Sequence, residues 1–274
     1  MSAESDLKNS AVADRRYSFA MKIATWNINS LRKRLDRLLT WLETARPDVV
    51  CLQETKCSDE QFPVMDLRAA GYCAAYHGEK SYNGVAILSK VEPGDVRISL
   101  GDEVEDTQAR VIVATVEKVR VYSIYAPNGQ GVGSPAYDYK LQWYARLGSC
   151  LARESERDLA ICGDFNVAPA DVDVHDPQLW RGAIMCSEEE RRAFNELCAP
   201  GLQDTLRLHH PEGGLYSWWD YRMLSFPKDR GLRIDAILAS ATLAANCTAS
   251  GIDREMRKGK EPSDHAPVWA EFGE

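Results

Sequence analysis

The sequence predicts an α/β fold, a four-layer α/β sandwich in which two packed, mixed but mostly antiparallel β-sheets are flanked by helices. From Met21 onward, short apolar runs of strand length alternate with stretches of helical period. Short polar or glycine-containing connections join several consecutive runs, which favours antiparallel pairing. The sequence contains no internal repeat and no low-complexity linker. We therefore expect one domain over residues 21–274, preceded by a flexible leader over residues 1–20.

The predicted strands are short apolar runs, most of them rich in β-branched or aromatic residues and bounded by turn-forming residues. In chain order they cover Lys22–Trp26, Val49–Leu52, Tyr72–Tyr76, Val85–Leu88, Arg110–Val116, Arg120–Tyr125, Leu159–Cys162, Ile234–Leu238 and Val268–Phe272. Short connections join the four consecutive strands between Tyr72 and Tyr125, which predicts antiparallel pairing within this stretch.

Helices are predicted where apolar residues recur at helical spacing behind a capping residue. Ser30 is expected to cap a helix from Leu31 to about Thr44, whose leucines share one face. Ser58 and Gln61 resemble a capping box that opens a short helix. The other predicted helices are Tyr137–Ala152 and one that begins with the capping box Ser187-Glu188-Glu189-Glu190 and ends near Cys198.

The composition is typical of a globular protein, with 45% hydrophobic and 27% charged residues. No apolar run approaches the roughly 20 residues that a membrane helix needs. The N-terminus lacks the apolar stretch of a signal peptide. The eight cysteines are scattered without a CxxC pair, which favours reduced, buried thiols over disulfides or a zinc site. We therefore expect a cytoplasmic protein with no membrane partner.

The formal net charge of −8 leaves the partner open. Taken alone it argues against a nucleic-acid partner, because phosphate binding relies on Lys and Arg. However, carboxylates gathered around a metal ion also lower the net charge, and a local basic face can exist on an acidic protein.

Carboxylate, amide and phenol side chains follow or flank most of the predicted strands. A single such residue is usually a turn, cap or surface residue, but repetition at strand after strand is harder to explain in that way. Strand ends on one edge of a packed sandwich converge on one rim, where sites are usually built. The residues concerned are Asn27, Asn29, Gln53, Glu54, Tyr125, Asn128, Asp164, Asn166, Asp235 and Asp264, and Lys56 and His265 accompany them.

These residue types suit the hydrolysis of a phosphodiester assisted by a hard divalent cation. Carboxylate and Asn oxygens bind Mg²⁺ or Mn²⁺, whereas His265 lacks the spacing of a zinc site. A metal ion, a general base, an orienting Asn and a His–Asp pair are what attack of water on phosphorus requires. The sequence has no serine or cysteine nucleophile signature and no P-loop.

Six motifs, in this order, resemble those of the endonuclease/exonuclease/phosphatase superfamily, and the resemblance spans about Met21 to Phe272. It implies the reaction type, metal-dependent hydrolysis of a phosphoester, and leaves the substrate open. The motifs are Trp26-Asn27-Ile28-Asn29, Leu52-Gln53-Glu54-Thr55-Lys56, Tyr125-Ala126-Pro127-Asn128, Gly163-Asp164-Phe165-Asn166, Arg233-Ile234-Asp235 and Ser263-Asp264-His265.

A narrower resemblance, to the exonuclease III-like abasic-site endonucleases, rests on Ser217-Trp218-Trp219-Asp220-Tyr221-Arg222 and Gly231-Leu232-Arg233-Ile234-Asp235. It implies that Trp218, Leu232 and Ile234 line a pocket for a flipped-out sugar that lacks its base. Extrusion of a nucleotide costs least where base pairing is already lost, so a small apolar pocket can select such sites. Core packing is the alternative role for at least one of the two tryptophans.

The partner implied by this resemblance is duplex DNA with abasic sites or blocked 3′ ends. We expect the protein to be monomeric. The implied activities are incision 5′ to the abasic site, 3′→5′ exonuclease and 3′-phosphodiesterase or phosphatase activity. Glu54 would be the principal ligand of a Mg²⁺ or Mn²⁺ ion. The other residues implied at the metal are Asn29, Asp264, Asp164 and Asn166.

The resemblance also implies the catalytic roles. Asp164 would position or deprotonate the attacking water, and Asn27 and Asn166 would orient the phosphate or Asp164. His265, held by Asp235, would stabilise the transition state. The residues implied in contacts with the phosphate or the DNA are Tyr125, Asn128, Arg222 and Lys56.

An acidic DNA-binding protein needs a confined basic surface. The candidates are Arg32, Lys33, Arg34, Lys56, Arg222, Lys228, Arg230 and Arg233.

Two alternatives compete with this interpretation. One is a superfamily phosphodiesterase or phosphatase that acts on a lipid or inositol phosphate, but such enzymes lack the tryptophan-rich stretch before Asp235. The other is a DNA- or protein-binding module with an inactive site, which would require loss of Glu54, Asp164, Asp235 or His265, and all four are present.

Overall fold

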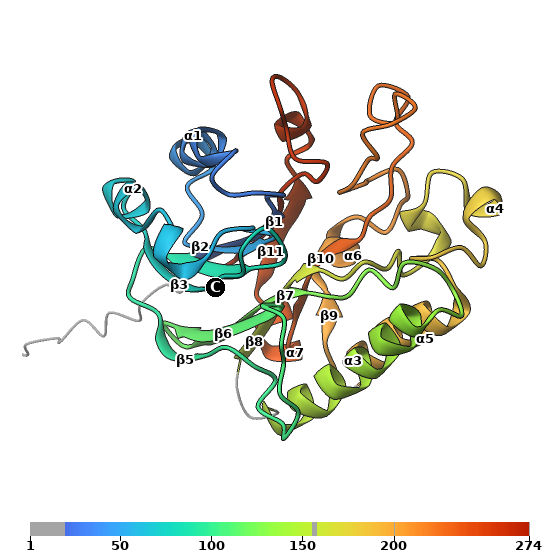
Figure 1. The fold of residues 1–274 in the computed structure, drawn as a ribbon, viewed down its shortest axis with the longest axis horizontal. Coiled ribbons are helices and arrows are strands. Elements are labelled where there is room, and N and C mark those ends of the chain that lie inside the picture. Colours follow the sequence, from blue (N-terminus) through green and yellow to red (C-terminus); the bar gives the residue numbers. More distant parts are fainter. Residues whose placement is uncertain (1–19, 155–157, 200, 274) are drawn as a thin grey trace, which may run out of the picture.

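Two six-stranded sheets packed face to face form the centre of the molecule, a computed structural model that describes residues 20–154, 158–199 and 201–273 (Figure 1). One sheet has the strand order β11-β12-β1-β2-β4-β3, and the other has the order β5-β6-β7-β8-β10-β9. Helices cover the outer face of each sheet, as Figure 1 shows. The predicted two-sheet α/β fold is therefore confirmed. The predicted leader lies outside the described residues except for Ala20.

The strands of the first sheet are β1 (Met21–Asn27), β2 (Val49–Gln53), β3 (Cys73–His77), β4 (Val85–Ser89), β11 (Cys247–Ile252) and β12 (Val268–Phe272). The strands of the second sheet are β5 (Gly94–Arg97), β6 (Val111–Val116), β7 (Val119–Tyr125), β8 (Asp158–Asp164), β9 (Gln203–Asp204) and β10 (Asp235–Ala239). Each predicted strand corresponds to one of these. The short strands β5, β9 and β11 were not predicted, because their sequences contain no apolar run. Most of their residues are partly or fully exposed in the structure.

The α-helices are α1 (Leu35–Ala45), α2 (Val64–Ala69), α3 (Pro135–Leu151), α4 (Pro177–Trp180), α5 (Glu188–Cys198), α6 (Thr205–His209) and α7 (Ala241–Ala244). The capping box at the start of α5 is confirmed, because the Ser187 hydroxyl accepts from the Glu190 amide while the Glu190 carboxylate accepts from Ser187 N. None of the helices in the described residues is long and apolar enough to cross a bilayer.

The predicted start of the first helix is wrong. Residues 28–31 continue alongside the chain that follows β2, with Ser30 N donating to Glu54 O and Leu31 N donating to Thr55 O. Ser30 has a φ of 88°, which excludes the extended backbone of an N-cap, and α1 begins only at Leu35. Pairing with the segment around Glu54 outweighs the local helical periodicity here. The predicted capping box at Ser58 is also wrong, since that residue precedes a 3₁₀ turn without a side-chain cap.

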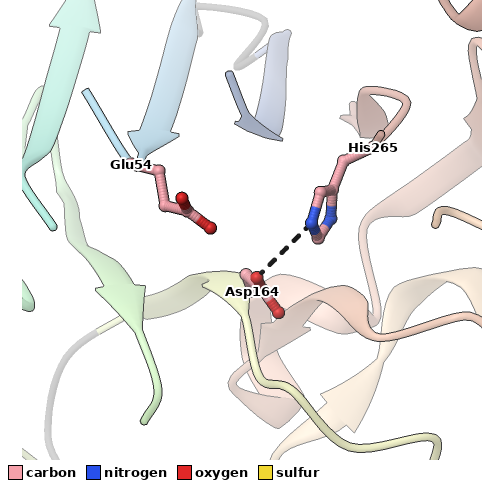
Figure 2. A group of neighbouring side chains, drawn as sticks. All are labelled: Glu54, Asp164 and His265. Carbon is pink, nitrogen blue, oxygen red and sulfur yellow. Dashed lines mark ion pairs between the residues drawn. The ribbon is translucent and has the colours of Figure 1, made fainter. Parts of the chain in front are cut away.

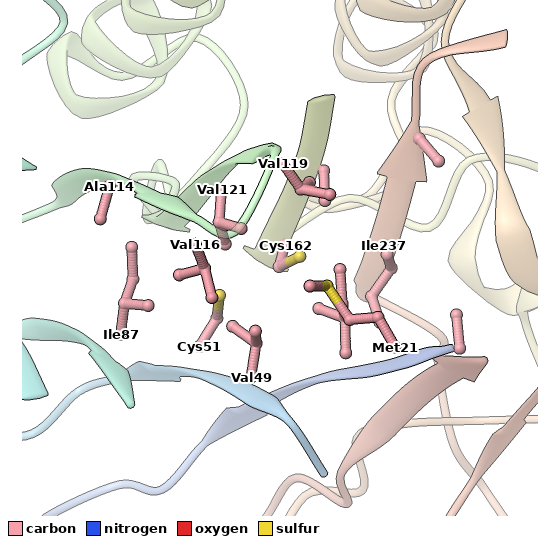
Figure 3. Packing of buried hydrophobic residues seen from close by; sticks show 14 of the residues in the cluster. Met21, Val49, Cys51, Ile87, Ala114, Val116, Val119, Val121, Cys162 and Ile237 are labelled. Carbon is pink, nitrogen blue, oxygen red and sulfur yellow. The ribbon is translucent and has the colours of Figure 1, made fainter. Parts of the chain in front are cut away.

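Three apolar layers hold the sandwich together. The layer between the sheets consists of small aliphatic side chains and thiols, including Val49, Cys51 and Val121, packed closely in Figure 3. A second layer joins the first sheet to α1 and α2 around Trp26 and Trp41. The third layer joins the second sheet to α3 and α5. Among the three layers, small aliphatic residues dominate the one between the sheets, whereas the tryptophans and most of the other large aromatic residues lie in the two layers beneath the helices.

The topology brings the polar strand ends to one rim. In each sheet one central pair is parallel, β1 with β2 and β7 with β8, so the two carboxyl ends of each pair lie at the same edge of their sheet. The two edges meet, because Asn27 Nδ2 at the end of β1 donates to Asp164 Oδ2 at the end of β8. Asn27 pairs with Gln53 at one end of the first sheet. In the second sheet, Asp164 is in register with both Tyr125 and Asp235. The expected convergence of polar residues is therefore confirmed.

Gly163 permits close packing at this rim. A Cβ atom at this position would overlap the carbonyl oxygen of Ile124 in the neighbouring strand. We expect Gly163→Ala to lower the free energy of unfolding by about 2–3 kcal/mol, because the β7–β8 pair must separate locally. Urea denaturation measures the change. Gly131→Ala is the control, because nothing lies within 4 Å of a Cβ there, and an equal loss in both variants would contradict the overlap argument.

Candidate active site

A carboxylate pair bridged by an amide lies at the rim. Glu54 follows β2 with a φ of 50°, and Asp164 is the last residue of β8. Asn27 Nδ2, at the end of β1, donates to Glu54 Oε1 at 2.8 Å and to Asp164 Oδ2 at 2.9 Å. The Asn27 side chain thus connects the two sheets and holds both carboxylates in place.

His265 enters the same cluster from the segment before β12, and its ring lies opposite Asp164 in Figure 2. Its Nδ1 lies 2.8 Å from Asp235 Oδ2, and its Nε2 lies 3.7 Å from Asp164 Oδ2. Ser217 Oγ donates to the same Asp235 oxygen at 2.6 Å. All of these side chains are buried, so Asp235 fixes the imidazole orientation and leaves Nε2 facing Asp164.

The burial of these charges perturbs their proton affinities. Removal from water, opposed by His265 and reinforced by Asp235, raises the pKa of Asp164 to about 7. Burial alone would lower the pKa of His265, but the Asp235 and Asp164 carboxylates outweigh it and raise that pKa to about 10. Burial also opposes ionisation of Glu54, yet Lys56 and Asn27 keep the pKa of Glu54 below its usual value. Perturbed titratable groups of this kind are typical of a functional site.

Tyr125, the last residue of β7, lies beside the cluster. The Arg110 guanidinium lies 4.8 Å from the centre of its ring. Burial, and the negative charges of Glu54 and Asp164, raise the pKa of the Tyr125 hydroxyl. The phenol therefore keeps its proton at neutral pH and can donate a hydrogen bond.

Asn166 and Asn128 are held together next to Asp164. Asn166 has a φ of 51°, and its backbone N donates to Asp164 Oδ1 at 2.8 Å. Its side chain donates to Ala126 O and accepts from Asn128 Nδ2. Lys140 of α3 donates to the backbone oxygens of both asparagines, at 2.7 Å for Asn166 and 3.2 Å for Asn128. Asn128 itself is exposed.

Asn29, Lys56 and Asp264 form the opposite side of the cluster. Lys56 Nζ lies 2.6 Å from Glu54 Oε2 and donates to Asn29 Oδ1 at 2.7 Å. Asn29 Nδ2 donates to Asp264 Oδ1 at 2.9 Å, and Trp218 Nε1 donates to Asp264 Oδ2 at 3.1 Å. Asp264 therefore joins this polar group to the tryptophan-rich segment.

The predicted apolar residues gather beside the polar cluster. Trp218 is half-buried, while Leu232 and Ile234 are buried in one apolar group with Trp218 at its edge. Backbone bridges pair Trp218 with Leu232 and with His265. Trp219, in contrast, is fully buried and packs edge-on against Phe226. One of the two tryptophans is thus a core residue, as the alternative interpretation allowed.

Two of the proposed basic-surface residues are buried. Arg233 is 1% exposed and pairs with Asp173 at 2.5 Å and Asp204 at 2.7 Å. Arg34 is 6% exposed. Their assignment to a basic surface is wrong, because sequence alone does not reveal which arginines have buried partners. Arg222 is 84% exposed and pairs with Asp220.

Comparison with known proteins decides the family. Residues 24–265 match the Endonuclease/Exonuclease/phosphatase family. The chain belongs to this family. It is 38% identical over 266 residues to exodeoxyribonuclease III of Haemophilus influenzae, an alignment that covers 92% of this chain and 100% of the relative.

Two solved structures are similar to this chain over almost their whole length. A 3′ phosphatase from Neisseria, bound to a product DNA hairpin, matches with a TM-score of 0.90 and 46% identity, covering 92% of this chain and 99% of the other. An AP endonuclease from Archaeoglobus fulgidus matches with a TM-score of 0.89 and 39% identity, again covering 92% and 99%. The fold is therefore that of an exonuclease III-like member of the family.

The residues at the rim fit a divalent cation. Glu54, Asp164 and His265 each offer a ligand atom, and these atoms all lie within 4.8 Å of one another (Figure 2). Two carboxylates with amide oxygens nearby suit a hard, oxygen-binding ion. His265 was predicted as a catalytic residue only, yet it belongs to this group.

Two buried residues at the site were missed by sequence reasoning. Ser217 stabilises Asp235, and Lys140 holds the backbone beside Asn166. Ser217 lay within a motif of the narrower resemblance, whereas a lysine inside an amphipathic helix gives no signal of burial.

Proposed function

We propose that this chain is a DNA repair nuclease that uses a divalent metal ion to hydrolyse the phosphodiester 5′ to abasic sites in duplex DNA. Its further activities would be 3′→5′ exonuclease and the removal of 3′-phosphate and other blocking groups. One observation carries the proposal: the cluster of Glu54, Asp164 and His265 adjoins the apolar group that contains Trp218. A centre for phosphoester hydrolysis thus lies beside a surface suited to a sugar without a base.

Glu54 is the proposed principal metal ligand, because its carboxylate faces Asp164 across the rim. When bound, the ion would polarise the phosphoryl oxygens and offset the charge that builds on them. We propose Mg²⁺ as the metal, with Mn²⁺ as a substitute. The residues proposed to complete the site are Asn29, Asp264, Asp164 and Asn166.

Asp164 is proposed to position the attacking water and accept its proton. Its two oxygens accept from Asn27 Nδ2 and Asn166 N, which restrict the carboxylate to one orientation. A preorganised base avoids the cost of reorientation in the transition state. Asn166 and Asn27 therefore act through Asp164 as well as through the phosphate.

His265 is proposed to stabilise the charged transition state. Since Nδ1 pairs with Asp235, the imidazole presents Nε2 to the space next to Asp164. A donor fixed in a buried site stabilises developing charge more strongly than one in water. Tyr125, whose phenol stays protonated, is proposed to donate to the phosphate or the leaving oxygen.

The relatives support DNA as the substrate. The Haemophilus protein is named an exodeoxyribonuclease, and the Neisseria structure holds a product DNA hairpin. Trp218, Leu232 and Ile234 are proposed to receive the flipped-out sugar. The residues proposed to touch the DNA around it are Asn128, Arg222 and Lys56. We also propose that residues 21–274 act as one monomeric domain in the cytoplasm.

Removal of the metal is expected to abolish the reaction. With a labelled duplex that carries one abasic-site analogue, Mg²⁺ should support nicking immediately 5′ to the lesion, EDTA should stop it, and excess Mg²⁺ should restore it. An undamaged duplex is the control, and duplexes with a recessed 3′ end or a 3′-phosphate report the other two activities. Nicking that persists in EDTA would contradict the metal mechanism.

The same assay tests the substrate. Absence of nicking on every DNA, together with Mg²⁺-dependent phosphate release from an inositol phosphate or lipid phosphoester, would overturn DNA as the substrate while retaining the reaction type.

A further inference from the structure

Arg34 lies in the turn between β1 and α1, 6% exposed, and contacts three separate segments of the rim. Its Nη1 donates to the backbone oxygen of Asn29. Its Nε donates to Glu261 O at 3.1 Å, and its Nη2 donates to Pro262 O at 3.0 Å and to Tyr221 Oη at 3.1 Å. All three guanidinium nitrogens are therefore in use.

The Tyr221 hydroxyl completes this junction. It donates to Pro262 O at 2.8 Å, so Arg34, Tyr221 and Pro262 contact one another in a closed triangle. The Arg257 guanidinium lies 5.4 Å from the centre of the Tyr221 ring and donates to Trp219 O and Ser263 O. The segment that contains Trp218 is thereby attached to the segment that contains Asp264.

Each segment that Arg34 contacts contributes a residue to the candidate active site. Asn29 belongs to the first segment, Asp264 to the second, and Trp218 to the third. Their side chains meet at Asp264, whose two oxygens accept from Asn29 Nδ2 and Trp218 Nε1. The backbone junction at Arg34 thus sets the spacing of the same three residues whose side chains join the metal side to the apolar side.

The chemistry of the junction favours a positioning role over a charge-pairing one. The acceptors of Arg34 named above are three carbonyls and a phenol, and none is a carboxylate. A planar guanidinium with fixed donors matches several acceptors at once, which a lysine ammonium on a flexible stem cannot do. Substitution would leave carbonyl groups without partners, and the loop would shift to hydrate them.

We propose that Arg34 is a positioning residue that couples the Trp218–Tyr221 segment to the metal-binding side of the site, so that binding of the lesion and alignment of the metal ligands occur together. The inference rests on the proposed function, because it assigns the lesion to Trp218 and the metal to Glu54 with Asn29 and Asp264. Arg34 does not touch the substrate in this arrangement and acts through the backbone of Asn29 and the hydroxyl of Tyr221.

The test is a double-mutant cycle with Arg34→Met and Tyr221→Phe, measured as kcat and KM for nicking of the abasic duplex. Tyr221 is 52% exposed, so its substitution leaves the fold intact. Each single variant is expected to lower kcat/KM by roughly 10-fold, with a higher KM and a higher Mg²⁺ concentration for half-maximal rate. Because the two residues act through one contact, the double variant should lose little more than the worse single one.

Arg37→Met is the matched control. Arg37 donates to the backbone oxygens of Met256, Lys258 and Lys260 in the neighbouring segment. The Arg37→Met variant should lower the midpoint of thermal unfolding, as Arg34→Met does, while leaving the KM and the Mg²⁺ concentration for half-maximal rate unchanged. Arg34→Lys keeps the positive charge and should retain only part of the activity. It replaces Arg34→Met in the test if that variant does not fold.

Four results separate the possibilities. Losses that multiply in the double variant, or an equal rise in KM for Arg37→Met, would overturn the coupling. Full activity of Arg34→Lys would show that charge, not geometry, matters, and would overturn it as well. If the wild-type protein does not nick the abasic duplex, the proposed function fails and the inference fails with it. The assay of the wild type alone reveals this outcome, without any variant.

Discussion

Asp164→Asn is expected to lower kcat for nicking of the abasic duplex by about 10³-fold or more. The substitution keeps the size of the side chain and leaves an oxygen able to accept from Asn166 N. It removes the negative charge and the basic oxygen next to His265 Nε2, which lies 3.7 Å away in the wild type. A loss confined to the transition state should appear in kcat, with KM changing little.

The matched control is Asp158→Asn, the same substitution at the opposite end of the same strand. Asp158 is the first residue of β8 and accepts a hydrogen bond from Thr242, whereas Asp164 is the last residue of that strand. Single-turnover nicking rates and thermal midpoints should be measured for both. An Asp164→Asn enzyme that retains more than about a tenth of the wild-type rate would remove Asp164 from the role of base.

The positions of much of the candidate active site could be predicted because its residues follow buried strands. Asn27, Glu54 and Asp164 each lie where an apolar run of the sequence ends, and the parallel β1–β2 and β7–β8 pairs bring these ends together. The register of Asp164 with Asp235 then determines which carboxylates meet. A strand has few ways to place its last residue, so a local pattern was sufficient here.

The supporting residues could not be predicted in this way. Arg233 stands inside a recognisable motif, yet its partners Asp173 and Asp204 lie far away in sequence, and Arg233 was wrongly predicted to belong to a basic surface. Burial of a charge depends on a partner that the fold supplies, and no local pattern encodes that partner. The same holds for the start of α1, where hydrogen bonds from residues 30 and 31 to Glu54 and Thr55 override helical periodicity.

Lys140→Met is expected to lower the free energy of unfolding by about 3–5 kcal/mol. This is a large effect for a lysine of an amphipathic helix, whose burial the sequence pattern does not indicate. Lys140 and Glu190 are both fully buried, and their charged atoms lie 2.5 Å apart. Burial lowers the pKa of Lys140 despite the nearby Glu190 carboxylate, so the ion pair carries a desolvation cost that mutual contact and the hydrogen bonds of each partner offset. Without the lysine, Glu190 would hold an uncompensated charge in an apolar setting.

Urea denaturation of three variants distinguishes loss of the ion pair from loss of the hydrogen bonds that Lys140 Nζ donates to the backbone. Lys140→Met with Glu190→Gln should recover part of the stability, because the buried charge is gone while the glutamine oxygen can still accept from Ser187 N. Lys118→Met, at an exposed turn, should stay within about 0.5 kcal/mol of wild type. A double variant as unstable as Lys140→Met would mean that the contacts of Nζ with the backbone of Asn166 and Asn128, rather than the ion pair, dominate. In that case the stability of the core and the geometry beside Asp164 would depend on the same two hydrogen bonds.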